Sequence, residues 1–315
     1  MTLRHFLADD DLTAAEQREV LDRAIRLKAS PFSDRPLAGP QVVAVLFDKP
    51  TLRTQVSFAT GIAHLGGQSM VVDAKLAQIG VRESIADVTR VLTRQTSAIV
   101  WRTFGQDRII EMAQHATVPV VNALTDDYHP CQILADLLTI REHCGDLVGL
   151  AFAYLGDGAN NMAHSYLLGG ALAGMHVRIG TPPAYPPQAE ILDRARSIAA
   201  TTGGSVTVTD DPVAAVAGAH AVATDTWVSM GQEDEGGERR GEASPFVPYA
   251  VSPEIMAKAA PGAIFLHCLP AYRGHEVDAA VIDGPQSVVW DEAENRLHVQ
   301  KAILSFLLEQ SRSTS

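Results

Sequence analysis

Short runs of β-branched and other apolar residues alternate with helical patterns along almost the whole chain. In the first half these runs lie at 42–47, 69–72, 98–101 and 118–122, and in the second half at 150–155, 177–180, 205–209, 221–224 and 263–266. Strands that alternate with helices in this way pair in parallel, with helices on both faces of the sheet. The sequence therefore predicts an α/β fold of two doubly wound domains with parallel sheets.

A long helical pattern over residues 130–144 separates the two series of strands. Its apolar residues on one side are Ile133, Leu134, Leu137, Leu138 and Ile140. We expect this helix to join the two domains, since 315 residues are enough for two sizeable cores. The predicted domains are residues 1–145 and 146–292, and a terminal helix at about 293–310 is expected to pack back on the first domain.

The formal net charge of −12 restricts the partners of the chain. Nucleic acids and anionic membranes need a basic face, so neither is expected. No apolar run approaches the roughly 18 residues of a membrane span, and the acidic amino terminus is unlike a signal peptide. The cysteines at 131, 144 and 268 are odd in number and far apart, which disfavours a disulfide framework and a zinc site. We expect a cytoplasmic protein.

The first strand ends at a Lys-Pro turn that is followed by Thr51-Leu52-Arg53-Thr54. The helical spacing of apolar residues from Val56 onward indicates that a helix opens here. The N–H groups of a helix N-terminus and the planar fork of an arginine both suit phosphate oxygens. The sequence predicts an anion site, and the alternative is an N-capped surface helix.

Polar side chains also follow the third and fourth strands. Arg102 comes directly after the run 98–101, which indicates an anion or carbonyl partner, with a surface salt bridge as the alternative. His129 precedes the proline that opens the long helix, where a capping or packing role is the alternative. Because ligands of doubly wound sheets bind at the carboxyl ends of strands, both residues are candidates for the site.

The first strand of the second half leads into Gly156-Asp157-Gly158-Ala159-Asn160-Asn161. The third glycine of a dinucleotide motif is missing, so a nicotinamide cofactor is not expected, and the asparagines instead suit a small polar ligand. Asp225 follows another strand and suits a substrate ammonium, although it could cap a helix. The segment 231–244, with four glycines and five acidic residues, indicates a mobile loop or lid.

His267-Cys268-Leu269-Pro270 ends the last predicted strand. Adjacent strand residues point to opposite faces, so His267 is badly placed to activate Cys268 as a nucleophile. Arg296 lies near the start of the terminal helix, where a cation is unfavourable. We therefore expect Arg296 to have a role outside that helix.

In the order and spacing of these motifs the chain resembles the aspartate/ornithine carbamoyltransferase superfamily. The most specific motifs are His267-Cys268-Leu269-Pro270 and the pattern Asp-x-x-x-Ser-Met-Gly at 225–231, which favours ornithine over aspartate as the amine. The resemblance extends from the first strand to Arg296. It implies a carbamoyl-phosphate domain followed by an ornithine domain, no metal or organic cofactor, and a homotrimer with active sites at subunit interfaces.

The resemblance also implies a role for each matching residue. Those expected to hold the phosphate are Thr51, Leu52, Arg53 and Thr54, and those expected around the carbamoyl group are Arg102, His129, Gln132 and Arg296. Gln78 is expected to reach a neighbouring subunit's site, and Cys268 and Leu269 to line the reaction centre. The residues expected to bind ornithine are Asn161, Asp225, Ser229 and Met230. Catalysis is expected from Arg102, His129, Cys268 and Arg296.

The implied reaction is attack of the ornithine side-chain amine on carbamoyl phosphate, giving citrulline and phosphate for arginine biosynthesis without a covalent intermediate. The phosphate loop departs from the family's Ser-Thr-Arg-Thr-Arg, because Leu52 lacks a hydroxyl and Gln55 lacks a charge. A hydrogen bond to a charged group is worth about 1.5–3 kcal/mol, so we expect a lower affinity and retained activity. Two alternatives stay open: carbamoyl transfer to another amine such as putrescine, and a non-catalytic ligand-binding paralogue.

Overall fold

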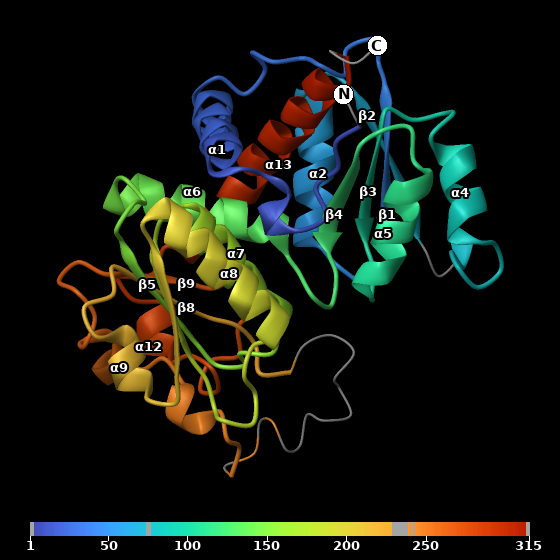
Figure 1. Ribbon diagram of the computed structural model, residues 1–315. Helices are drawn as coiled ribbons and strands as arrows, with labels where there is room; N and C mark the ends of the chain where they lie inside the picture. The colour runs from blue at the N-terminus through green and yellow to red at the C-terminus, as the bar shows by residue number, and fades with distance from the viewer. Residues whose placement is uncertain (1–2, 74–76, 229–238, 240, 242, 313–315) are drawn as a thin grey trace. The chain divides into compact units, whose positions relative to one another are not determined.

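The computed structural model describes residues 3–73, 77–228, 239, 241 and 243–312. The chain divides into two compact units, of which unit 1 comprises Met1–Ala135 with Glu294–Ser315 and unit 2 comprises Asp136–Ala293. In Figure 1 each unit contains its own sheet. The division falls inside the helix α6 (Pro130–Cys144), whereas the sequence places the domain boundary near residue 145.

Unit 1 contains a four-stranded sheet in the order β2-β1-β3-β4, with all pairs parallel. The strands are β1 (Val42–Phe47), β2 (Gln68–Asp73), β3 (Ala98–Arg102) and β4 (Val120–Leu124). The helices are α1 (Ala14–Ala29), α2 (Arg53–His64), α4 (Ile85–Leu92), α5 (Gln106–His115) and the unit 1 part of α13 (Val289–Arg312). Figure 1 shows α1, α2 and α13 on one side of the sheet and α4 and α5 on the other.

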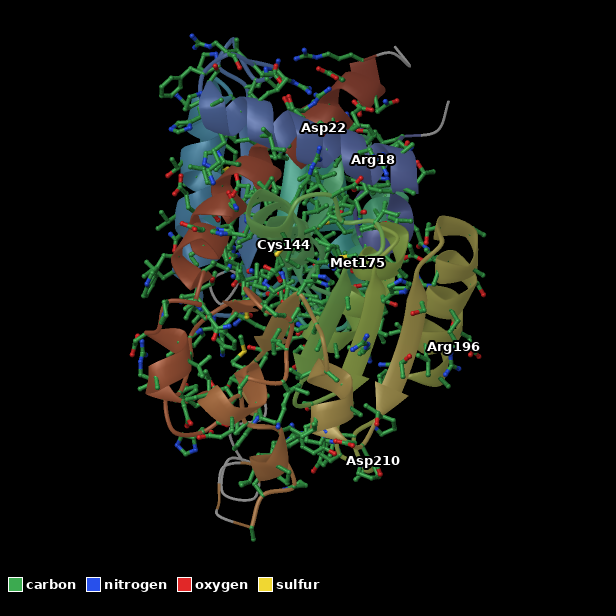
Figure 2. All side chains as sticks on the ribbon, turned by 90° about the vertical axis from the view of Figure 1, so that its left-hand side faces the viewer. Arg18, Asp22, Cys144, Met175, Arg196 and Asp210 are labelled. Atoms are coloured by element: carbon green, nitrogen blue, oxygen red, sulfur yellow. The ribbon has the colours of Figure 1, made fainter. Side chains whose placement is uncertain are left out.

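Both faces of the first sheet are buried, as the apolar runs predicted. Leu46 and Trp101 pack with Met112 of α5 on one face, while Val43 and Val45 of β1 point to the opposite face and are also buried. Polar residues lie on the outer sides of the helices; Figure 2 shows Arg18 and Asp22 along α1. This arrangement of a parallel sheet between two helical layers confirms the predicted fold class for unit 1.

Unit 2 contains a five-stranded parallel sheet in the order β7-β6-β5-β8-β9. The strands are β5 (Ala151–Leu155), β6 (His176–Gly180), β7 (Ser205–Thr209), β8 (Ala221–Thr224) and β9 (Ile264–Leu266). The helices are α7 (Asn161–Leu172), α8 (Ala189–Thr202), α9 (Pro212–Val216), α11 (Pro253–Met256) and α12 (Ala279–Ile282). Figure 1 shows α7 and α8 on one side of this sheet and α9 and α12 on the other. Figure 2 shows Arg196 on α8, where it is exposed beside Asp193 at 3.5 Å.

The strand order of each sheet reverses once, and the reversal defines where a ligand is expected. In unit 1 the chain leaves β1 toward β2 on one side and β3 on the other, and in unit 2 it leaves β5 toward β6 and β8. Ligands of open α/β sheets bind outside the carboxyl ends of the strands at this switch point. The residues that follow β1, β3, β5 and β8 are therefore the first to consider.

Two helices contain residues of both units. They are α6 and α13, and they correspond to the interdomain helix and the terminal helix predicted from the sequence. In the described part of the chain, no helix is both long enough and apolar enough to cross a membrane.

Candidate active site

The N-terminus of α2 follows β1 at the switch point of the first sheet. Leu52 occupies the N-cap position, but its side chain makes no capping bond and is 73% exposed. The Thr51 hydroxyl accepts a long 3.4 Å hydrogen bond from the Thr54 N–H. The first N–H groups of a helix have no partner within the helix, so this weakly capped end suits an anion.

Three arginines from distant parts of the chain bring positive charge to the end of unit 1 where α2 begins. Arg53 is the first residue of α2, Arg102 is the last residue of β3, and Arg296 lies in α13. Arg102 and Arg296 are buried, and Nη2 of Arg296 donates to Oγ1 of the buried Thr54 at 2.7 Å. The burial of Arg102 excludes the alternative of a surface salt bridge.

The positive charges of all three guanidinium groups act on His129. Burial is the largest cause that lowers the pKa of His129 well below its usual value, followed by the positive charges of Arg296, Arg102, Arg53 and Lys49. The imidazole is therefore neutral at physiological pH. In a chain of net charge −12, such a concentration of buried positive charge is typical of a site for an anion. Gln132, one turn into α6, is fully buried in the same unit.

The depressed pKa of His129 predicts a pH dependence of stability. Unfolding restores an ordinary pKa of about 6.5, so below that pH the unfolded chain binds a proton that the folded chain does not. Stability linked to His129 is thus fully present above pH ~6.5 and is lost as the pH falls toward the folded-state pKa. We expect the Tm of the wild type to fall more steeply between pH 7 and 5 than that of His129→Gln, measured by calorimetry. Parallel curves would show that His129 titrates normally in the folded protein.

A bulge fixes the end of β3 that carries Arg102, and a polar network fixes the turn before His129. The register of β3 and β4 shifts between Trp101 and Arg102, and a bulge of this kind re-aims the side chain beside it. The Thr125 hydroxyl donates to Gln106 Oε1 at 2.6 Å and accepts from the Tyr128 N–H at 3.2 Å. The turn before His129 is therefore held to the start of α5.

Gln78 lies in a turn between β2 and α4. Its φ of +48° is in the left-handed region, and the side chain is exposed. The Gln78 carbonyl accepts hydrogen bonds from the N–H groups of Val81 and Arg82, each at 3.0 Å. The turn is thus held by hydrogen bonds and leaves the Gln78 side chain exposed. Exposure is necessary for a side chain that is expected to reach a neighbouring subunit.

In unit 2, Asp225 follows β8 and contacts Cys268, which follows β9. The Cys268 thiol donates to Oδ1 of the buried Asp225 at 3.3 Å. Burial raises the pKa of Asp225, and burial together with the charge of Asp225 raises the pKa of Cys268 well above its usual value. The thiol is therefore neutral, which suits a residue that orients a ligand and disfavours a thiolate nucleophile.

His267 supports the turn at Cys268 and Leu269. Leu269 has a φ of +60°, and its N–H donates to Nδ1 of His267 at 2.9 Å. Because Nδ1 accepts, the ring proton lies on Nε2, which is 3.3 Å from Oε1 of the buried Glu276. His267 is thus engaged with its own turn and not with the thiol, as predicted, but the reason is the turn and not strand alternation, since β9 ends at Leu266.

Asp225, His267 and Cys268 place potential metal-ligand atoms within 4.8 Å of one another. Both ring nitrogens of His267 are already engaged, by Leu269 and Glu276. His267 therefore has no ring nitrogen available to an ion, and the two remaining donors are fewer than the three or four protein ligands of a typical zinc site.

The two asparagines after β5 have different positions. Asn160 caps α7, accepting from the Ala163 N–H at 2.8 Å and donating to the Tyr154 hydroxyl at 2.9 Å. Asn161 is the first residue of α7 and is partly exposed. Asn161 therefore stays the candidate for a ligand.

Other predicted residues are only partly covered by the structure. Ser229 and Met230 lie outside the described residues. The expected loop or lid at 231–244 does as well, except for residues 239, 241, 243 and 244. The described Arg239 is buried and pairs with Asp157 at 2.7 Å.

Two residues near the candidate site were not singled out from the sequence. Lys49 is buried, forms an ion pair with Asp126 and contributes to the positive charge around His129. Asp157 is buried against Arg239. A lysine two residues after a buried strand is a usable signal for Lys49, whereas nothing in the sequence pairs Asp157 with Arg239.

Two family models match nearly the whole chain. The model described as aspartate/ornithine carbamoyltransferase, carbamoyl-P binding domain, matches residues 4–142. The model described as aspartate/ornithine carbamoyltransferase, Asp/Orn binding domain, matches residues 148–307. The chain therefore belongs to the aspartate/ornithine carbamoyltransferase family.

Within this family, several highly similar relatives are ornithine enzymes. The ornithine carbamoyltransferase of Clavibacter sepedonicus is 63% identical over 308 residues, covering 98% of this chain and 99% of the relative. The structure of ornithine carbamoyltransferase from Pyrococcus furiosus is similar with a TM-score of 0.91 at 43% identity, over 96% of each chain. A mutant N-acetyl-L-ornithine transcarbamylase complexed with carbamyl phosphate and N-succinyl-L-norvaline has a TM-score of 0.86 at 32% identity, covering 97% of this chain and all of that one.

Proposed function

We propose that the protein is an ornithine carbamoyltransferase, which transfers the carbamoyl group of carbamoyl phosphate to the side-chain amine of L-ornithine and releases L-citrulline and phosphate. The observation that carries this proposal is the group of Arg53, Arg102 and Arg296 around a neutral His129. Buried positive charge of this kind suits a dianionic phosphate and the oxygen of an activated carbonyl. The family and its ornithine-specific relatives support the same reaction.

For carbamoyl phosphate we propose two sets of contacts. The phosphate is held by Thr51, Leu52, Arg53 and Thr54, through the open N-terminus of α2. The carbamoyl group is contacted by Arg102, His129, Gln132 and Arg296, with Cys268 and Leu269 lining the reaction centre. In the proposed homotrimer, Gln78 extends to the site of a neighbouring subunit. A mass three times the 33.7 kDa of the chain, measured by light scattering, would support this assembly.

For ornithine we propose contacts from Asn161, Asp225, Ser229 and Met230. An ordinary side-chain amine has a pKa near 10.4, so using its neutral form at pH 7 costs roughly 4.6 kcal/mol. Asp225 and the neutral Cys268 thiol orient the amine as it attacks the carbonyl carbon. Arg102, His129 and Arg296 stabilise the negative charge that develops on the oxygen, an effect worth about 10²–10³ in rate per donor. The amine proton leaves with the departing phosphate, and no covalent intermediate forms.

We also propose the wider assignment that the sequence suggested. Residues 1–145 with the helix at about 293–310 form the carbamoyl-phosphate domain, and residues 146–292 form the ornithine domain. The three free cysteines agree with a reducing, cytoplasmic location. Formation of citrulline from ornithine is a step of arginine biosynthesis.

A citrulline assay with purified protein tests the reaction. Carbamoyl phosphate is supplied with ornithine, N-acetylornithine or putrescine in parallel, and each carbamoylated product is quantified. We expect ornithine to give at least ~100-fold higher kcat/KM than either competitor. Putrescine lacks the α-carboxylate and N-acetylornithine has a blocked α-amine, and losing a hydrogen bond to a charged group costs about 1.5–3 kcal/mol or more. Faster turnover of another amine would establish the first alternative, and binding of carbamoyl phosphate without any product would establish the second.

The altered phosphate loop makes a separate prediction. Leu52 and Gln55 are both exposed, and Leu52 provides no side-chain cap. The double change Leu52→Thr and Gln55→Arg should lower the KM for carbamoyl phosphate by up to about tenfold, near 1.4 kcal/mol, through one regained bond to a charged group. Steady-state kinetics at saturating ornithine measures this, with Leu52→Ala as the control that removes the side chain without adding a donor. An unchanged or higher KM would mean that the surrounding loop has adapted, so that Leu52 is no defect.

A further inference from the structure

Arg108, on the first turn of α5, contacts three separate segments of unit 1. Its Nη2 donates to the Ile79 carbonyl at 2.8 Å, and its Nε donates to Oγ1 of Thr103 at 3.0 Å. Nη2 also lies 3.7 Å from Oδ2 of Asp48. One guanidinium group therefore links the turn that carries Gln78, the segment after β3 and the end of β1.

The same guanidinium is held in one orientation by its surroundings. Its central carbon lies 5.2 Å from the centre of the Trp101 ring, and its side chain is about three-quarters buried, with 24% exposed. Gly80 has a φ of +78°, and a Cβ at this position would lie 3.0 Å from Nη1 of Arg108. A side chain at position 80 would therefore crowd the guanidinium, and the glycine leaves room for it.

The linked segments are those that present proposed substrate contacts. Ile79 directly follows Gln78, whose left-handed backbone is costly for a residue with a side chain. Thr103 directly follows Arg102, and Asp48 precedes the loop at Thr51. Asp48 is also joined to β3, since its N–H donates to the Arg102 carbonyl at 2.9 Å.

We propose that Arg108 is a positioning residue for carbamoyl phosphate, acting through Gln78. It holds the turn at 78–80 in the orientation that presents the Gln78 side chain, and it contacts no reacting atom itself. The inference rests on the proposed function, because it takes Gln78 as a contact of carbamoyl phosphate. A lysine cannot replace Arg108, since it lacks the planar fork that reaches Ile79 and Thr103 at once.

The test compares Arg108→Lys with the wild type in steady-state kinetics. We expect the KM for carbamoyl phosphate to rise about tenfold, with the KM for ornithine changed less than twofold. Arg4→Lys is the matched control, because Arg4 also bonds one carboxylate and one backbone carbonyl, those of Glu16 and Asp11, at the surface of unit 1. Arg4→Lys should lower the Tm by a similar amount and leave both KM values unchanged. Equal increases in both KM values for Arg108→Lys would indicate general destabilisation and overturn the proposal.

A double-mutant cycle separates positioning from other effects. If Arg108 acts through Gln78, adding Arg108→Lys to Gln78→Ala should raise the KM for carbamoyl phosphate less than twofold further, whereas multiplied effects would overturn the proposal. Thr103→Val removes one hydrogen-bond acceptor of Arg108 at constant shape, and it should raise the KM for carbamoyl phosphate about threefold. If neither Thr103→Val nor Arg108→Lys changed this KM, the proposal would also be overturned.

The proposed function is judged separately, on the wild type. If the wild type prefers another amine, the cycle is run with that amine. If it turns over none, the Kd of carbamoyl phosphate from calorimetry replaces the KM. A wild type that does not bind carbamoyl phosphate would overturn both proposals.

Discussion

Replacing Arg102 by alanine is expected to lower kcat at least ~100-fold, the effect of removing one donor that stabilises a developing oxyanion. Arg102 is buried at the end of β3, beside a bulge that fixes its direction. Its charge acts on the neutral His129 together with those of Arg53 and Arg296. The loss is therefore expected in the chemical step, with a smaller effect on the KM for ornithine.

The stability of the Arg102 variant should differ little from that of the wild type. Removing one of several like charges that surround His129 relieves repulsion, which offsets the packing that the truncated side chain no longer provides. A Tm within a few degrees of the wild type, measured by calorimetry without ligands, would support a role in catalysis. Arg90→Ala is the control, since the i,i+3 pair of Arg90 with Asp87 in α4 is exposed and the variant should keep full activity. Turnover of Arg102→Ala within a few-fold of the wild type would remove Arg102 from the site.

Asp225→Asn is expected to abolish citrulline formation while the fold and the binding of carbamoyl phosphate persist. The amide keeps the shape of the carboxylate and still offers an oxygen to the Cys268 thiol. In the wild type this thiol donates to Asp225 at 3.3 Å. The amide lacks the second carboxylate oxygen and the negative charge that, in the proposed site, accept from and orient the ornithine amine. We expect at least a ~100-fold loss of kcat/KM, equivalent to about 2.7 kcal/mol.

The stability of the Asp225 variant separates the site from the alternative of a helix cap. Burial raises the pKa of Asp225, so the carboxylate is unfavourable in the folded state. Its linked stability is present below the ordinary pKa of 3.8 and is lost as the pH rises through the folded-state pKa. At pH 7 the Asn variant should thus melt at or above the Tm of the wild type. No helix of the described chain begins at Asp225, and a fully active Asn variant would contradict its assignment to ornithine.

The strands were predictable because a doubly wound sheet buries both faces of each strand. The runs at 42–47, 205–209 and 221–224 coincide with β1, β7 and β8. The fourth run was placed too early: Pro119 has no N–H for the ladder, so β4 begins after it and extends to Leu124 beside the bulge. The terminal helix begins earlier than predicted, at Val289, because Val289 is part of the core of unit 2.

The candidate residues were predictable in part, because strand ends at a switch point can be located from the sequence. Arg102 and Asp225 follow this rule, whereas His129 follows β4, the strand at the edge of its sheet. The protonation states of His129 and Cys268 were not predictable, because they depend on burial and on charges from distant segments. The orientation of Arg108 depends in the same way on tertiary contacts, with Ile79 and Trp101.

Unit 1 is built from both ends of the chain, and this has a consequence during protein synthesis. Arg296 and Thr54, which are joined by a 2.7 Å hydrogen bond, are separated by 242 residues. A ribosome therefore finishes unit 2 before it adds Arg296 to unit 1. A nascent or truncated chain that ends before Arg296 lacks this cation, so full binding of carbamoyl phosphate at the proposed site should appear only after Arg296 has been translated.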